Sequence, residues 1–289
     1  MNILEDVPLP TGVFGVLSGP LPGPRVVIVG STHGDEPCGT NAILGVLQKL
    51  SLMRGTAVFV QGNPRAYEQK VRFTEANLNR MFKKDEDIPE EKKRTYEYAR
   101  ARELMPLYTS ADALLDIHSS ESAEAPPFVI CTERSRSVAA HMPFPILSWG
   151  WDVIEPGGSD DLMDRYGKIG IGIECGYDND PLANDRAKGA VYSFLSSFSL
   201  IDPVEEMEKP TRFVHAVYAH MPRVDFVPSR VFADFEEVKK DEVIGYDGGF
   251  PMKAVEDGCV LFVRNRKAPG QEAYIFALEK ERPTPEALS

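Results

Sequence analysis

The stretch Val26–Gly39 reads VVIVGSTHGDEPCG and combines a strand pattern with a polar turn. Its four aliphatic residues, Val26–Val29, predict a buried strand, and Gly30 ends that strand just before His33 and Glu36. An imidazole and a carboxylate three positions apart at the exit of a strand can bind one divalent cation if a third ligand comes from elsewhere. Since H-x-x-E by itself is most often part of a solvated loop, the rest of the chain must supply that ligand.

Apolar runs followed by polar side chains recur along the first two thirds of the chain. Further strands are predicted at Ala57–Val60, Ala113–Ile117, Phe128–Cys131 and Gly170–Ile173, and helices at Thr40–Leu52, Pro89–Tyr108, Asp160–Lys168 and Asn184–Phe198. Strands that alternate with helices predict an α/β fold, with a mixed, mostly parallel sheet covered by helices on both faces. Ligands of such sheets bind beyond the carboxyl ends of the strands, where His33, Glu36, His118 and Glu174 are expected to meet.

The sequence pattern changes after about Asp202. Short β-rich runs, such as Phe213–Tyr218, Arg230–Phe232 and Tyr274–Leu278, are separated by glycine turns and predict a small antiparallel barrel or sandwich. We therefore expect an α/β domain over residues 1–205 and a small all-β domain over residues 206–289.

The composition excludes several classes of protein. Of the 289 residues, 43% are hydrophobic and 26% are charged, as is typical of a soluble globular protein. The net charge of −12 would repel a phosphate backbone, and the apolar runs are far shorter than the roughly 18 residues that a membrane-spanning helix needs. The N-terminus lacks the pattern of a signal peptide. We expect a cytoplasmic protein without nucleic-acid or membrane partners.

The four cysteines, Cys38, Cys131, Cys175 and Cys259, have no C-x-x-C spacing, which argues against a disulfide framework and a thiolate zinc site. Cys38 and Cys175 each lie within two residues of a candidate site residue, so either could be a nucleophile. Because buried apolar cysteine is common, we favour the interpretation that both are small core residues.

The predicted strand ends bring two imidazoles and two carboxylates to one rim of the sheet. A catalytic zinc ion takes three protein ligands and keeps one position open, and two histidines with one glutamate form a known ligand set. The remaining carboxylate could then take a proton from water. We expect Asp116 on the opposite face of the strand from His118 and do not count it as a ligand.

Five short segments in a fixed order carry a family resemblance. They are His33-Gly34-Asp35-Glu36, Asn63-Pro64-Arg65-Ala66, Arg72 followed by Asn79-Arg80, Asp116-Ile117-His118, and Gly172-Ile173-Glu174-Cys175-Gly176. Together they resemble the succinylglutamate desuccinylase/aspartoacylase family, whose core is similar to that of the zinc carboxypeptidases. The small β domain also fits the layout of that family.

The resemblance implies roles for individual residues. His33, Glu36 and His118 would bind one zinc ion per chain, and Glu174 would be the general base and later the acid. Arg72, Asn79 and Arg80 would hold the substrate near the metal, a role that suits arginine because its guanidinium binds carboxylates with two hydrogen bonds and keeps its charge.

Three positions depart from the family pattern or are hard to align with it. Asn77 stands where the family commonly has aspartate, which could alter the orientation of Arg72 or Arg80. Arg165 is the candidate for the arginine that polarises the scissile carbonyl, with Lys168 as the alternative. Tyr274 is the candidate for a tyrosine that closes over the substrate from the β domain.

The leading hypothesis is a zinc-dependent amidohydrolase that removes the acyl group from a small anionic N-acyl amino acid or a related carboxylate. One alternative is a carboxypeptidase-type peptidase acting on short peptides, and another is a metal-binding protein of the same fold without turnover. The acyl group, the amino acid and assembly into a homo-oligomer are left open by the sequence.

Overall fold

The predicted strand Val26–Val29 is the second half of β2 (Leu21–Gly30), which lies within the parallel part of a large sheet in a computed structural model of the chain. The structure describes residues 7–122, 125–204, 209–269 and 272–282. Strands β3 (Arg54–Gln61) and β4 (Ala113–Ser120) pair with β2 in parallel, one on each side. The four aliphatic side chains are fully buried, as expected for a central strand of a sheet with both faces covered.

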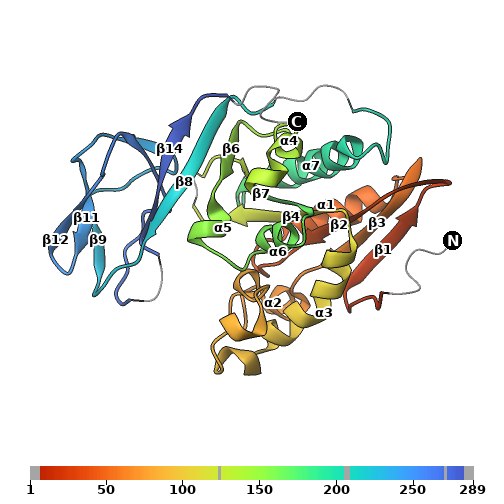
Figure 1. Cartoon of the computed structure of the whole chain (residues 1–289), viewed down its shortest axis with the longest axis horizontal. Coiled ribbons are helices and arrows are strands. Elements are labelled where there is room, and N and C mark those ends of the chain that lie inside the picture. The colour runs from red at the N-terminus through yellow and green to blue at the C-terminus, as the bar shows by residue number, and fades with distance from the viewer. Residues whose placement is uncertain (1–6, 123–124, 205–208, 270–271, 283–289) are drawn as a thin grey trace.

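The main sheet has 11 strands in the order β1-β3-β2-β4-β7-β5-β6-β8-β14-β13-β10 (Figure 1). The strands not yet placed are β1 (Val13–Ser18), β5 (Phe128–Cys131), β6 (Ile146–Trp149), β7 (Ile169–Tyr177), β8 (Arg212–His220), β10 (Glu236–Val238), β13 (Gly258–Leu261) and β14 (Tyr274–Lys280). β3, β2, β4 and β7 run parallel, whereas β5 runs antiparallel to β7. The predicted mixed, largely parallel α/β sheet is confirmed.

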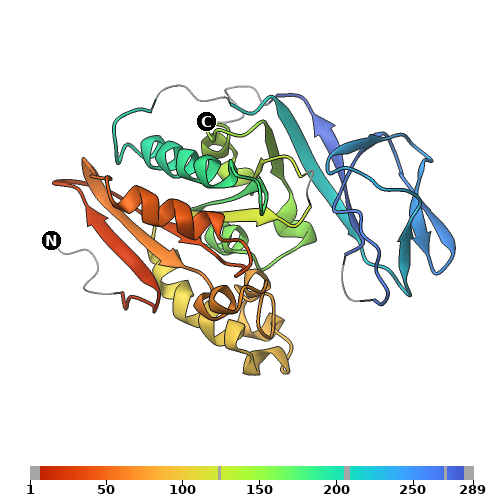
Figure 2. The same ribbon diagram turned by 180° about the vertical axis from the view of Figure 1, so that it is seen from behind.

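Helices cover both faces of the sheet. Helices α3 (Tyr96–Ser110) and α6 (Ser159–Arg165) lie on the face toward the viewer in Figure 1, and α1 (Cys38–Leu47) and α7 (Ala183–Ser197) lie on the other face, as Figure 2 shows. The shorter helices are α2 (Pro64–Gln69), α4 (Arg136–Ala139) and α5 (Trp151–Ile154). Side chains of a strand alternate between faces, so β2 contributes Val26 and Ile28 to the core under α1 and α7, and Val27 and Val29 to the core under α3 and α6.

The C-terminal strands form two layers at one end of the molecule. β8, β14, β13 and β10 continue the main sheet, and β9 (Phe226–Pro228), β11 (Val243–Asp247) and β12 (Phe250–Lys253) form a separate antiparallel sheet. Phe226 and Phe276 belong to one apolar core shared by the two layers. The predicted domain boundary after residue 205 falls within residues 205–208, which lie outside the described residues, and the division into two domains stays a prediction.

Some predicted elements differ from the observed ones. The helix expected from Pro89 begins only at Tyr96, after Thr95 caps it with its side chain. The strand expected at Arg230–Phe232 is wrong, since these residues are in no strand and Arg230 forms ion pairs with Glu236 and Glu242. β7 continues to Tyr177, so Glu174 lies within a strand and not after it.

In the part of the chain that the structure describes, no helix combines the length and the apolar character needed to cross a lipid bilayer.

Candidate metal centre

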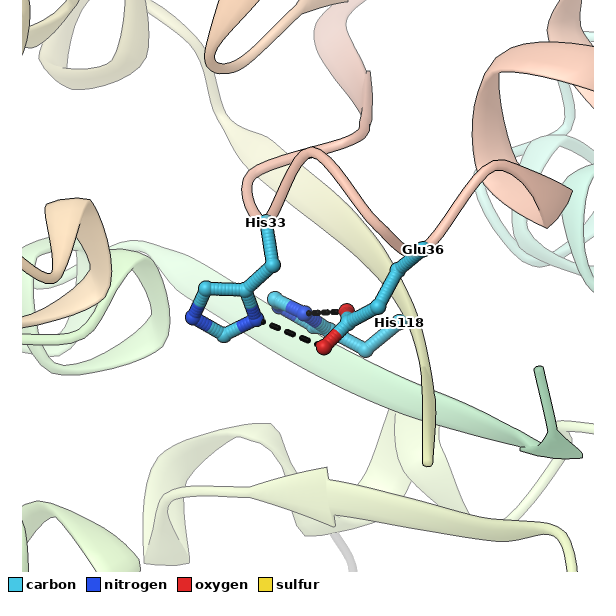
Figure 3. A group of neighbouring side chains, drawn as sticks. All are labelled: His33, Glu36 and His118. Carbon is cyan, nitrogen blue, oxygen red and sulfur yellow. Dashed lines mark hydrogen bonds and ion pairs between the residues drawn. The ribbon is translucent and has the colours of Figure 1, made fainter. Parts of the chain in front are cut away.

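His33, Glu36 and His118 meet at the carboxyl ends of β2 and β4. Each of the three can direct one ligand atom to a common point, with these atoms all within 4.8 Å of one another. His33 Nδ1 lies 2.8 Å from Glu36 Oε1 and His118 Nδ1 lies 2.8 Å from Glu36 Oε2, so each imidazole faces one oxygen of the carboxylate (Figure 3). The three residues are 4%, 2% and 5% exposed, respectively, so the cluster is almost fully removed from bulk water.

The loop that carries His33 and Glu36 is held in place by backbone contacts. A side chain at Gly34 would overlap the backbone of Ala66, and the Gly34 amide donates a hydrogen bond to the carbonyl of Arg72 at 3.2 Å. Ser31 adopts a φ of +54°, and its hydroxyl lies 2.8 Å from that of Thr40. These contacts of the surrounding loop therefore help to fix the positions of His33 and Glu36.

The outer nitrogen of each imidazole also faces an oxygen. His33 Nε2 lies 3.0 Å from Asn77 Oδ1, and His118 Nε2 lies 3.4 Å from Asp116 Oδ2. With a cation bound, a proton on each Nε2 would leave both Nδ1 lone pairs for the metal, which is the tautomer that such outer acceptors favour in histidine ligands. This donor set, two imidazole nitrogens and a carboxylate in a buried pocket, fits a divalent metal ion.

The structure corrects one expectation about the residues around the cluster. Asp116 was expected on the opposite face from His118, which is wrong because residues two apart in a strand point to the same face. Its carboxylate also accepts hydrogen bonds from Thr32 Oγ1 and Ser159 Oγ, each at 2.7 Å. Asn77 Oδ1 lies beside His33 Nε2 and accepts from the amide of Asn79, so this departure from the family pattern lies next to a candidate metal-binding residue.

Burial and close charges shift the pKa values of the three cluster residues. Burial lowers the pKa of His33. Burial also acts to lower the pKa of His118, but the carboxylates of Asp116 and Glu36 outweigh it and raise that pKa well above its usual value. Burial opposes ionisation of Glu36, yet the two imidazoles hold its pKa well below the usual range. These directions describe the protein without a cation, whose charge would dominate the local balance.

Glu174 lies beside the cluster on the neighbouring strand. It pairs with His118 in the parallel β4–β7 register, so the two side chains leave the sheet on the same face. Burial raises the pKa of Glu174 well above its usual value, and the negative charge of Glu36 acts in the same direction. Within the described part of the chain, Glu174 Oε2 has no hydrogen-bond partner although it is buried. Such a carboxylate is suited to hold a proton or pass it on.

Of Arg72, Asn79 and Arg80, which the resemblance assigns to substrate binding, only Arg72 contacts the cluster directly. Its Nη1 atom donates a hydrogen bond to Glu36 Oε1 at 2.8 Å, while 42% of its side chain remains exposed. Asn79 Oδ1 accepts a hydrogen bond from the amide of Ser159, whose hydroxyl holds Asp116. Arg80 forms an ion pair with Glu155.

The remaining predicted site residues lie elsewhere. Arg165 pairs with Asp161 and donates to the carbonyl of Phe82, two residues after Arg80, so it braces the loop that carries Arg80. The ammonium of Lys168 lies 3.6 Å from Asp112, at the amino ends of β4 and β7 and thus at the opposite edge of the sheet. The ring of Tyr274 packs on those of His220 and Tyr218 in the C-terminal core and is 2% exposed. The catalytic role of Arg165 and the substrate contact of Tyr274 gain no support from these positions.

Cys38 and Cys175 are buried in the core under α1 and α7. The Cys38 thiol lies 3.6 Å from the backbone carbonyl of His118, and burial raises the pKa of Cys175 well above the usual thiol value. This environment favours the interpretation of both as core residues.

Residues 22–191 match the succinylglutamate desuccinylase/aspartoacylase catalytic domain, which is more than half of the chain. The chain belongs to this family. The matched range contains the three cluster residues, Glu174 and the loop of Asn79 and Arg80.

The names of individual relatives give different activities. A probable aspartoacylase of Prochlorococcus marinus (strain AS9601) is 26% identical over 256 residues, which cover 77% of this chain and 81% of the relative. An N-acyl-aromatic-L-amino acid amidohydrolase (carboxylate-forming) of Xenopus laevis is 34% identical over 109 residues, or 35% of this chain and 36% of the relative. A solved succinylglutamate desuccinylase from Vibrio parahaemolyticus superposes with a TM-score of 0.72 over 94% of this chain and 89% of its own, at 21% identity. This last similarity concerns the fold alone.

Proposed function

We propose that the protein is a zinc-dependent hydrolase that cleaves the amide bond of an N-acyl amino acid. The observation that carries this proposal is the buried His33, Glu36 and His118 cluster, with the second carboxylate of Glu174 on the adjacent strand. The named activities of relatives, an aspartoacylase and an N-acyl-aromatic amino acid amidohydrolase, support the same reaction class.

Each group in the centre has a distinct task in this proposal. A zinc ion held by His33, Glu36 and His118 would polarise the scissile carbonyl and lower the pKa of water. Glu174 takes the proton from the attacking water and delivers it to the leaving amine. Its raised pKa suits this exchange, because a carboxylate that keeps its proton more strongly than usual can act as base and then as acid.

The outer partners of the imidazoles keep the ligand atoms aimed at the metal. Asn77 accepts the Nε2 proton of His33, and Asp116 accepts that of His118. Thr32 and Ser159 in turn fix the Asp116 carboxylate with hydrogen bonds. Because these partners hold the rings without touching the metal, they pre-organise the site.

In this proposal Arg72 binds the substrate carboxylate. One nitrogen of its guanidinium donates a hydrogen bond to Glu36, and the side chain remains partly exposed. The other N–H groups can therefore donate charge-assisted hydrogen bonds to an incoming carboxylate. Asn79 and Arg80 follow Asn77 directly on the loop whose Asn77 side chain contacts His33.

The proposal is tested by assaying the zinc-loaded protein against N-acetyl amino acids and against dipeptides. We expect hydrolysis of N-acetyl amino acids, with Glu174→Gln reducing kcat by at least about a hundredfold, as removal of a general base does. His141→Ala is the control, since His141 is exposed and contacts only the carbonyl of Ser137 among described residues. Parental rates in Glu174→Gln would contradict the role of Glu174, and faster cleavage of dipeptides would favour a peptidase.

A further inference from the structure

Glu97 is a buried carboxylate that lies outside the metal cluster. It is the second residue of α3, and it is 0% exposed. Its Oε1 atom accepts hydrogen bonds from the amide of Thr74 at 2.7 Å, the hydroxyl of Thr74 at 2.8 Å and the side-chain amide of Asn63 at 3.3 Å. Its Oε2 atom accepts from the amides of Glu75 at 3.2 Å and Ala76 at 3.1 Å. Five neutral donors therefore surround this buried carboxylate.

These hydrogen bonds favour the ionised form of Glu97. Burial opposes its ionisation, but hydrogen bonds from Thr74, Asn63 and Ala76 hold its pKa below the usual value. Hydrogen bonds to an ionised carboxylate are shorter and stronger than those between neutral groups. Consecutive backbone amides that point to one carboxylate form an anion-binding concavity, which is filled here by a side chain of the protein itself. The carboxylate thus fixes the backbone of residues 74–76 to the first turn of α3.

The amides that Glu97 holds lie between two residues that contact the metal cluster. Arg72 Nη1 donates a hydrogen bond to Glu36 Oε1 at 2.8 Å. Asn77 Oδ1 lies 3.0 Å from His33 Nε2. The segment of residues 72–77 therefore contacts the cluster at both of its ends, while Glu97 fixes its middle.

A second connection runs from Glu97 through Asn63 to the loop that carries two of the candidate ligands. Asn63 is 0% exposed, and its side chain also caps the start of α2. The Asn63 amide donates a hydrogen bond at 2.9 Å to the carbonyl of Ser31, two residues before His33. One carboxylate is therefore connected to both chain segments that contact His33.

We propose that Glu97 is a positioning residue for the metal centre, which holds residues 72–77 so that Arg72 and Asn77 keep their contacts with the cluster. This inference rests on the proposed function for the identity of the metal, but it concerns the binding of the ion and not the reaction. Among the described residues, the hydrogen bonds of the Glu97 carboxylate go to Asn63 and to residues 74–76, so Glu97 acts through these residues and not on the cluster directly. Since outer partners orient metal ligands, loss of this hold weakens metal binding.

The test measures zinc affinity by competition with a chromogenic chelator. Glu97→Gln keeps the shape of the side chain but turns an NH₂ group toward backbone N–H donors, so part of the hold on residues 74–76 is lost. Zinc affinity is expected to fall about tenfold in this variant. In a protein that carries both Arg72→Ala and Asn77→Ala, Glu97→Gln is expected to change zinc affinity by less than about twofold, because the contacts through which Glu97 acts are already absent.

Asp247→Asn is the matched control for a general loss of stability. Asp247 of β11 is also a buried carboxylate that accepts hydrogen bonds from consecutive backbone amides, those of Arg223 and Val224. Its substitution should lower Tm and leave zinc affinity unchanged.

Thr74→Val is the milder variant for the case that Glu97→Gln does not fold. It removes one hydroxyl donor to Glu97 and keeps the carboxylate and the backbone amides. Zinc affinity is expected to fall about threefold in this variant.

Three results would overturn the inference. They are an unchanged zinc affinity in Glu97→Gln, or in Thr74→Val if the former does not fold; an equal loss of affinity in Asp247→Asn; and an undiminished loss in the protein without the Arg72 and Asn77 side chains. Weaker zinc binding by Glu97→Gln, in a protein whose parent binds zinc but hydrolyses no N-acetyl amino acid, would support the role of Glu97 and count against the proposed function. A parent protein that binds no zinc would overturn both.

Discussion

His33 Nε2 lies 3.0 Å from Asn77 Oδ1, so the outer nitrogen of a candidate metal ligand faces a neutral amide where the family commonly has a carboxylate. The amide oxygen can only accept, which assigns the proton to Nε2 and leaves Nδ1 free for a metal. A carboxylate in that place would also raise the basicity of the ring.

Asn77 is therefore expected to influence zinc affinity. Asn77→Ala is expected to weaken zinc binding about tenfold or more, because the ring loses the acceptor that fixes its tautomer, and Asn77→Asp is expected to restore or exceed the parental affinity. Competition with a chromogenic chelator measures both. Asn41→Ala is the control, since Asn41 is exposed and its side chain forms a hydrogen bond to Asn184, away from the cluster. Equal zinc affinities for all of these variants would contradict the prediction.

Gly34 is expected to tolerate no side chain. Gly34→Ala places a methyl group into the backbone of Ala66 and should lower the free energy of unfolding by about 1–3 kcal/mol while weakening zinc binding. Gly45→Ala is the matched control, because a methyl group in that α1 position meets only the flexible end of Lys188 and improves helix propensity. Chemical unfolding of the two variants gives the comparison, and a fully stable Gly34→Ala protein would count against the tight loop.

Asp160 makes stability depend on pH. Burial raises its pKa from 3.8 to about 6, so the folded state holds a proton that the unfolded chain releases. Its contribution to stability is complete below pH 3.8 and is lost as pH rises through about 6. Asp160→Asn, which cannot ionise, should raise Tm relative to the parent more at pH 8 than at pH 4.

The control for this variant is Asp185→Asn, another aspartate in the first turn of a helix but an exposed one. Its Tm difference from the parent should not grow with pH in the same way. A difference between Asp160→Asn and the parent that is constant from pH 4 to pH 8 would show that Asp160 keeps an ordinary pKa.

Metal removal should destabilise the protein. A ligand present at about 1,000 times its Kd stabilises the folded state by about 4 kcal/mol, so a chelator is expected to lower Tm and added zinc to restore it. His118→Ala should abolish this zinc-dependent shift, because His118 belongs to the candidate metal cluster. His141→Ala should keep the shift, because His141 lies outside that cluster. A Tm insensitive to chelator in the parent would argue against a tightly bound metal.

Much of the fold and of the metal cluster follows from local patterns. The continuous aliphatic run Val26–Val29 indicates a strand buried on both faces, and parallel neighbours place their carboxyl ends at one edge. His33, Glu36 and His118 could therefore be expected to converge before any coordinates were known. The strand period of two also predicts that Asp116 shares a face with His118, so that partner could have been found from the sequence.

Other features depend on contacts between distant segments. The pairing of Arg80 with Glu155 joins residues 75 positions apart, and no periodicity in either segment indicates it. The burial of Tyr274 follows from the pairing of β14 between β8 and β13, which places its ring in the C-terminal core. Such placements are set by the packing of whole elements, which single-segment patterns do not encode.

The β6–β8 pairing has a consequence for engineering of the chain. Residues Ile146–Trp149 of β6 pair in parallel with Arg212–His215 of β8. Phe128 of β5, which pairs with Glu174 of β7, packs against Phe235 with 5.0 Å between the ring centroids. A truncation after residue 205 would leave β6 as an unpaired edge strand and expose the Phe128 ring, one strand away from Glu174. An unpaired edge beside exposed aromatic surface would favour aggregation. Exchange of the C-terminal segment between relatives should therefore preserve the ladder and the Phe128 contact, because β8 covers the edge of β6 in the main sheet.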